Sequence, residues 1–173
     1  MAAGVKIESI EKMLGTSGVS IIRIMPNLAV SIGAGTVLWC TNAPGNEKAA
    51  GFIDAMCEAG AFAKIDESKI DAGSAVSGCG PAFAYMFIDA MADGGVACGL
   101  TRKEALEYTT QVLIGAARMV QETEKHPDKL KDEVCSPGGS TIEGVLTLED
   151  GDFKSTVLSA VKASYKKTCE LGK

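Results

Sequence analysis

The sequence has one histidine, His126, and none of its six cysteines belongs to a Cys-x-x-Cys pair. Zinc sites need Cys and His at short spacings, so we expect no metal site and isolated, buried thiols instead. Asp and Glu (22) outnumber Lys and Arg (17), which leaves no basic stripe for nucleic acid. An apolar run of about 20 residues, the length that spans a bilayer, is also lacking. We therefore expect a cytoplasmic globular protein that binds neither nucleic acid nor a membrane.

The segment from Asp132 to Asp150 carries the strongest local signal. Gly138 and Gly139 have no Cβ, so backbone N–H groups in this loop can approach a ligand closely. Ser140 and Glu143 have the spacing of a capping box, which predicts a helix whose N-terminus attracts anions. The pattern favours a site for a small carboxylate or phosphate. Taken alone, however, Gly-Gly before a capped helix more often marks only a loop and a cap.

Four short motifs follow one another along the chain. They are Arg-Ile-Met-Pro-Asn at 23–27, Val-Ser-Gly-Cys-Gly-Pro-Ala at 76–82, Glu-Lys-His-Pro at 124–127 and Ser-Pro-Gly-Gly at 136–139. In order and spacing they resemble the pyrroline-5-carboxylate reductases, which reduce a cyclic imine with NADPH or NADH. The resemblance implies that 1-pyrroline-5-carboxylate is the substrate and L-proline the product.

The resemblance also implies a substrate site. Its residues would be Glu124 and the loop formed by Ser136, Pro137, Gly138, Gly139, Ser140 and Thr141. Thr141 is the expected catalytic residue, because a hydroxyl bonded to the ring nitrogen would orient hydride transfer and assist protonation. N–H groups near Gly139 and Ser140 would hold the carboxylate, and the cofactor would supply the hydride. Without the resemblance, Glu124 is a solvated carboxylate at the end of a charged run.

The cofactor contacts that the resemblance implies lie in three places. They are Ala3, then Met25, Pro26 and Asn27, and finally Glu133. Two departures accompany them: Leu28-Ala29 stands where the family usually has Thr-Pro, and Glu133 is an acid where the family usually has a neutral polar residue. Locally, Pro26-Asn27 is also explained as a turn that ends a strand. The segment that would distinguish NADPH from NADH is not in the sequence.

Hydrophobic patterning divides the sequence near Ile65. In residues 1–65, β-branched runs and a segment of helical spacing at 45–60 predict a βαβ arrangement. We expect this part to be the α/β remnant of a Rossmann-type domain. Asn27 would then lie at the carboxyl end of a parallel strand. Residues 66–173 predict helices only. The resemblance implies an all-α substrate-binding and dimerisation domain, like the helical C-terminal domain of 6-phosphogluconate dehydrogenase. Because no Gly-x-Gly-x-x-Gly occurs, we expect the chain to be a truncated form that is inactive alone.

The helical part predicts a partner subunit. The helix expected at 82–96 is apolar on most faces, which a small monomeric domain could not easily bury. We therefore expect a homodimer that can assemble further. Thr101 and Glu104 have capping-box spacing at the start of the next helix, and His126-Pro127 is typical of a stop followed by Pro at the first position of another helix.

Two other functions fit parts of the pattern. A non-catalytic dimerisation module derived from such a reductase would keep the helical fold and lose affinity for proline. A dehydrogenase of the β-hydroxyacid type would need a catalytic lysine on the helix after a Gly-rich stretch, but no lysine follows Gly78–Pro81 until Lys103. The dehydrogenase is the weakest of the three hypotheses.

Overall fold

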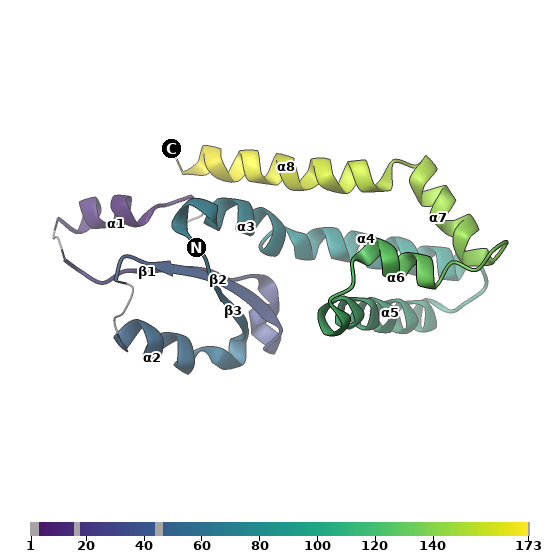
Figure 1. Ribbon diagram of the computed structural model, residues 1–173, viewed down its shortest axis with the longest axis horizontal. Helices are drawn as coiled ribbons and strands as arrows, with labels where there is room; N and C mark the ends of the chain where they lie inside the picture. The colour runs from purple at the N-terminus through teal and green to yellow at the C-terminus, as the bar shows by residue number, and fades with distance from the viewer. Residues whose placement is uncertain (1–3, 16–17, 44–46, 173) are drawn as a thin grey trace. The chain divides into compact units, whose positions relative to one another are not determined.

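The computed structural model describes residues 4–15, 18–43 and 47–172. Its strands are β1 (Ile22–Met25), β2 (Gly35–Thr41) and β3 (Gly60–Lys64), and its 3₁₀ helices are η1 (Leu28–Ile32), η2 (Cys57–Ala59) and η3 (Glu67–Lys69). Its α-helices are α1 (Ile7–Leu14), α2 (Glu47–Ala55), α3 (Ile70–Ser77), α4 (Gly80–Ala97), α5 (Arg102–Thr123), α6 (Pro127–Glu133), α7 (Ser140–Asp150) and α8 (Phe153–Leu171) (Figure 1). The expected fold class, an α/β part followed by helices, is confirmed.

The sheet has the order β1-β2-β3. β2 and β3 are parallel and joined through α2, which confirms the predicted βαβ unit. β1 is antiparallel to β2, with Met25 opposite Leu38, so the prediction that Asn27 ends a parallel strand is wrong. The reason is the short connection through η1, because adjacent parallel strands need a crossover of a dozen or more residues.

The described residues form two compact units. The first comprises those up to Ala82 together with those from Leu158 onward, and its core is a cluster of Ile7, Ile21, Cys40 and Ile70. Burial raises the pKa of the Cys40 thiol. The expectation of buried thiols fails elsewhere, because Cys57 is exposed in η2 and Cys98 is exposed in the turn after α4.

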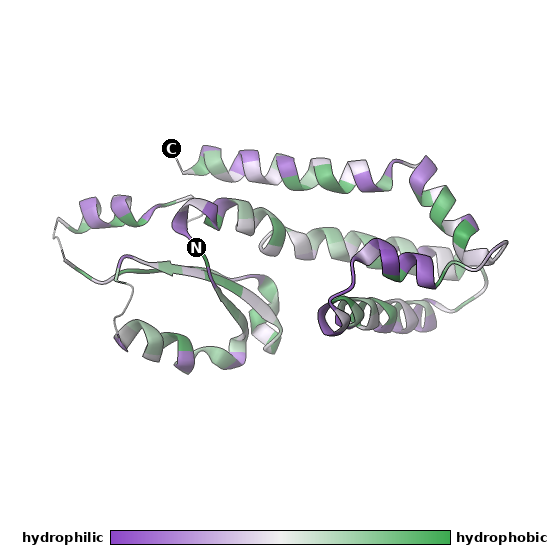
Figure 2. Ribbon diagram, in the orientation of Figure 1, coloured by the Kyte–Doolittle hydropathy of each residue, from purple (hydrophilic) through white to green (hydrophobic). Residues whose placement is uncertain are grey.

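The second unit, Phe83–Val157, is helical and buries little of its own apolar surface. Ala92 is the only buried residue of α4, whereas Tyr85 and Met86 are 54% and 74% exposed. Figure 2 shows hydrophobic residues along α4 and α5. The predicted capping box at the start of α5 is confirmed: Glu104 N–H donates to Thr101 Oγ1, and Thr101 N–H donates back to Glu104 Oε2.

Glu67–Ala97 is long and apolar enough to cross a membrane, judged by length and composition alone. On that criterion the expectation that the chain lacks such a stretch is wrong. The stretch consists of η3, α3 and α4, with a turn at Gly78 and Cys79 between the two α-helices. Within its own unit, α3 buries Ile70 and Ala75. Contact with a partner subunit accounts for an apolar α4 equally well.

Candidate functional site

The loop before α7 is a tight turn. Gly139 N–H donates to the Ser136 carbonyl at 3.0 Å, and Gly138 has φ +66°. Proline at the second position and a left-handed glycine at the third are typical of a type II turn. Gly139 is less constrained, because a Cβ there would crowd Ser136 Oγ, a side-chain atom that can rotate away. The turn itself therefore favours proline at 137 and glycine at 138, whether or not it binds a ligand.

The cap of α7 differs from the prediction. Gly139 is the N-cap and Ser140 is the first helical residue, so Ser140 does not form a capping box with Glu143. Because glycine has no side chain, no side-chain oxygen caps the first N–H groups of α7. These donors and the exposed Thr141 follow directly on the turn. Such a helix start can accept a carboxylate.

A second turn joins α5 to α6. Glu124 caps the end of α5 in a left-handed conformation, φ +53°, which is uncommon for a residue other than glycine. His126 is the N-cap of α6, its Nδ1 accepts Asp128 N–H at 3.3 Å, and Pro127 opens the helix. The interpretation of His126-Pro127 as a helix stop and start is confirmed. His126 therefore has a structural task.

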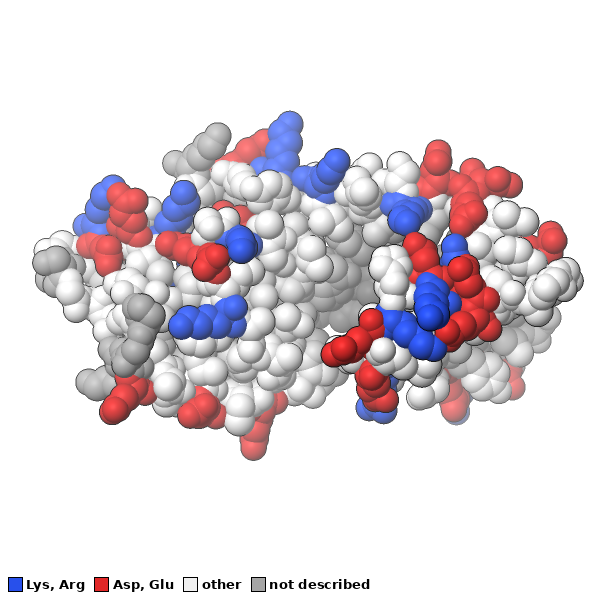
Figure 3. Space-filling model, viewed as in Figure 1, with Lys and Arg blue, Asp and Glu red and all other residues white. Residues whose placement is uncertain are grey.

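Glu133, at the end of α6, is bound to a lysine of the preceding turn. Lys125 Nζ lies 2.8 Å from Glu133 Oε1 and 2.9 Å from Oε2. The hydrogen bond and charge of Lys125 hold the pKa of the Glu133 carboxyl below its usual value. Figure 3 shows Lys, Arg, Asp and Glu intermingled, with a dense group over α6.

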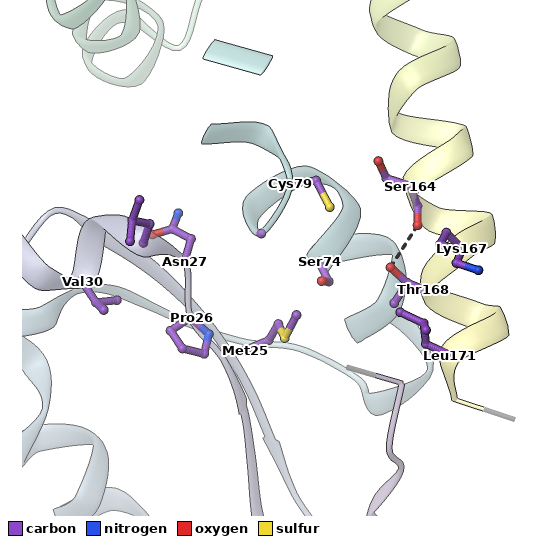
Figure 4. Close-up of a pocket in the computed structure, with 12 residues that line it drawn as sticks. Met25, Pro26, Asn27, Val30, Ser74, Cys79, Ser164, Lys167, Thr168 and Leu171 are labelled. Atoms are coloured by element: carbon purple, nitrogen blue, oxygen red, sulfur yellow. Dashed lines mark hydrogen bonds between the residues drawn. The ribbon is translucent and has the colours of Figure 1, made fainter. Parts of the chain in front are cut away.

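Met25, Pro26 and Asn27 line a cavity of about 700 Å³ in the first unit. Ser74, Gly78 and Cys79 line it from the α3 side, and Ser164, Lys167, Thr168 and Leu171 line it from α8 (Figure 4). Most of the lining surface is apolar, and Thr168 Oγ1 donates to the Ser164 carbonyl instead of into the cavity. The lining therefore offers a ligand an apolar surface with few polar contacts.

The carboxamide of Asn27 is used within the protein. Its Nδ2 donates to the Ser77 carbonyl at 3.0 Å, and its Oδ1 accepts Ala29 N–H at 3.2 Å and Thr36 N–H at 3.3 Å. The side chain thus joins the end of β1 to η1, β2 and α3. This supports the interpretation of Pro26-Asn27 as a strand-ending turn, and it leaves Met25 and Pro26 to offer apolar surface.

The predicted site residues fall into two groups. Met25, Pro26 and Asn27 belong to the first unit, whereas Glu124, Glu133 and residues 136–141 belong to the second. Ala3 lies outside the described residues. Sequence reasoning missed Lys125, because its pairing with Glu133 spans a turn and a whole helix and follows no helical spacing. It also missed the cavity-lining residues of α8, which only the tertiary fold brings close to Met25.

Comparisons with known proteins agree on one family. Residues 67–171 match the family model described as pyrroline-5-carboxylate reductase dimerisation. The chain is 41% identical over 172 residues to pyrroline-5-carboxylate reductase of Arabidopsis thaliana, covering 99% of this chain and 62% of that protein. It is 42% identical to human pyrroline-5-carboxylate reductase 2, covering 98% of this chain and 54% of that protein. The chain thus spans between half and two thirds of the length of these curated relatives.

Solved structures give the same result. The pyrroline carboxylate reductase of Plasmodium falciparum with NADP bound matches with a TM-score of 0.90 and 34% identity, covering 99% of this chain and 69% of that one. The enzyme from Streptococcus pyogenes matches with a TM-score of 0.91 and 31% identity, covering 98% and 66%. Fold and motifs define a subunit that joins part of a Rossmann-type domain to a helical dimerisation domain. The chain belongs to the pyrroline-5-carboxylate reductase family.

Proposed function

We propose that this chain carries the substrate site and dimerisation surface of an NADPH- or NADH-dependent pyrroline-5-carboxylate reductase, which reduces 1-pyrroline-5-carboxylate to L-proline. The observation that supports this most strongly is the turn at 136–139 followed by an α7 start without a side-chain cap. A turn of this kind presents donors to a small carboxylate on a rigid base. The proposal assigns residues 1–65 to the cofactor-binding domain and 66–173 to the substrate and dimerisation domain.

In this proposal the substrate carboxylate accepts hydrogen bonds from the uncapped backbone N–H groups near Gly139 and Ser140, at the start of α7. The Thr141 hydroxyl hydrogen-bonds the ring nitrogen, fixes the ring's orientation and assists protonation as the imine becomes an amine. Ser136, Pro137 and Gly138 shape the turn, and Glu124 contacts the substrate from the end of α5. Orientation contributes most of the catalysis, because hydride transfer requires no nucleophile from the protein.

The proposed cofactor residues fit the nicotinamide end of a dinucleotide. The apolar cavity lined by Met25 and Pro26 suits a flat ring, and Asn27 holds that wall in place. Bound there, the nicotinamide supplies the hydride. Glu133 is also proposed to contact the cofactor. Both of its carboxylate oxygens accept hydrogen bonds from Lys125, so a cofactor phosphate nearby would meet an ion pair and not an isolated negative charge. Ala3 stays a proposal from the resemblance alone.

The apolar, exposed α4 supports a homodimer as the working form, with further assembly possible through the same helical part. We also propose that the protein is located in the cytoplasm. A dimer that binds neither L-proline nor a cyclic imine would instead favour the non-catalytic module. Reduction of a 3-hydroxyacid's keto form would favour the dehydrogenase of the β-hydroxyacid type.

Thr141→Val tests the proposed catalytic residue. L-proline at about 100 times its dissociation constant should stabilise the wild-type chain by about 2.7 kcal/mol, seen as a higher melting temperature. The variant should lose most of this shift, because valine keeps the shape and removes the hydroxyl. Thr147→Val is the matched control in the same helix, since the Thr147 hydroxyl bonds the Glu143 carbonyl. Equal shifts in wild type and both variants would refute the assignment of Thr141.

NADPH oxidation with 1-pyrroline-5-carboxylate tests the reaction itself. The expected outcome is no turnover by the 173-residue chain alone, because its sequence lacks the glycine fingerprint that cradles the pyrophosphate. Turnover that Thr141→Val abolishes would show that the chain holds the cofactor by other means. It would overturn the expectation of an inactive chain while supporting the proposed reaction.

A further inference from the structure

The two proposed substrate segments, Glu124 and residues 136–141, are separated by a very short helix. α6 has seven residues, and helices of this length are not stable by themselves in water. Its start is capped by His126. Its end is held by the two hydrogen bonds from Lys125 to Glu133. One side chain therefore connects the turn before α6 to the last residue of the helix.

The turn that contains Lys125 is conformationally demanding. Glu124 is left-handed, a conformation that is strained for a residue with a Cβ. Lys125 N–H donates to Thr123 Oγ1 at 3.3 Å, and Thr123 Oγ1 donates to the Met119 carbonyl at 2.6 Å. These bonds fix the backbone on one side of Glu124. On the other side of Glu124, the ion pair with Glu133 holds Lys125 in place. Together these contacts favour the left-handed conformation of Glu124.

The other end of the connection is also held by hydrogen bonds. Val134 N–H donates to the Lys131 carbonyl at 3.2 Å, and Cys135 N–H donates to the Asp132 carbonyl at 3.1 Å. The chain thus runs from Glu133 to Ser136 through successive turns. A displacement of Glu133 would be transmitted to the substrate loop, because this link has little freedom to absorb it.

Glu133, one partner of the pair, lies at an apolar cleft. Glu133, Leu130 and Val134 of the α6 segment line a cavity of about 330 Å³ together with Met119 and Val120 of α5. The Lys125 and Glu133 side chains are 38% and 44% exposed, less than in the surface pair of Lys12 and Glu8, at 74% and 73%. The pair is nevertheless an exposed one, open to screening by water and salt, so its effect on affinity should be small.

We propose that Lys125 and Glu133 are positioning residues: their ion pair sets the separation between Glu124 and the 136–141 loop, and thereby the affinity for the substrate carboxylate. This role rests on the proposed function, because it assumes that both segments contact one ligand. The acid at position 133 then has a partner within the chain.

Three variants test the pair: Lys125→Met, Glu133→Gln, and the charge-exchanged double variant Lys125→Glu with Glu133→Lys. Hydrogen exchange of the amides in residues 124–134, without ligand, measures whether the pair holds the turn. Titration calorimetry with L-proline measures affinity. Each single variant should speed exchange there and weaken L-proline binding by about 2–5-fold, and the double variant should recover both. Lys12→Met removes an exposed ion pair in α1 and should change neither measurement.

The outcomes separate the two proposals. Unchanged exchange at 124–134 in both single variants would overturn the pair's role. Faster exchange with unchanged L-proline affinity would also overturn it, because the pair would then be merely structural. No L-proline binding by the wild type would refute the proposed function and the positioning role together, while the exchange data would still show whether the pair orders the turn.

Discussion

Replacing Arg23 by methionine is expected to lower the free energy of unfolding by about 3 kcal/mol. Arg23 is 8% exposed, and its Nη2 lies 2.9 Å from Asp71 Oδ1 while its Nη1 lies 3.3 Å from Glu67 Oε1. Glu67 Oε1 also accepts Ile7 N–H at 2.6 Å. The arginine thus joins β1 to the start of α3 and indirectly to α1. Its loss leaves two carboxylates in a partly buried site without their cation.

This loss of stability is at the low end for a broken buried pair, because Glu67 and Asp71 are 32% and 19% exposed and regain some hydration. Urea denaturation followed by circular dichroism measures the change, at one protein concentration since association contributes to stability. Arg102→Met is the matched control: its pair with Asp93 is 49% and 61% exposed and should contribute less than about 1 kcal/mol. Equal losses in the two variants would show that burial of Arg23 is not decisive.

Gly60→Ala is expected to destabilise the chain by about 4 kcal/mol, or to prevent β3 from pairing. Gly60 has φ +134°, a conformation open in practice only to glycine. It is also the register partner of Gly35 in the parallel pair of β2 and β3. A Cβ on Gly60 would overlap the backbone of Gly35. Backbone atoms cannot move aside as a flexible side chain can, so both strands would have to shift.

Gly51→Ala provides the opposite expectation for the same chemical change. Gly51 lies within α2, and a Cβ there would meet nothing within 4 Å. Removing a helical glycine should raise stability by about 0.5–1 kcal/mol. Thermal unfolding of the two variants side by side checks the pair of predictions. Similar melting temperatures for both would contradict the packing described at Gly60.

The helices were predictable because their signals are local. The capping box of Thr101 and Glu104 and the His126-Pro127 junction lie within a few residues, and the structure has both as expected. The broad apolar surface of α4 was also readable from composition alone. At α7 the local signal misled, because Ser140 has the right spacing from Glu143 but the turn at 136–139 makes Gly139 the cap.

Features that depend on tertiary packing were not predictable. The direction of β1 follows from its pairing with β2, and the run of β-branched residues in the sequence is the same for either direction. Burial of Arg23 has no local signal, because its partners Glu67 and Asp71 lie far along the sequence. For the site, the family motifs indicated the turn at 136–139. The role of Asn27 as a link between β1, β2 and α3 required the fold.

The most direct test of the central claim is an L-proline titration of the 173-residue chain followed by NMR of its backbone amides. If residues 136–141 form the substrate site, saturable shifts should concentrate at Gly139, Ser140 and Thr141, where the turn meets the start of α7. Residues of α2, in the other unit, should not shift and serve as an internal reference. Saturable binding with its shifts elsewhere, or no shift at any L-proline concentration, would contradict the claim that this loop binds the substrate.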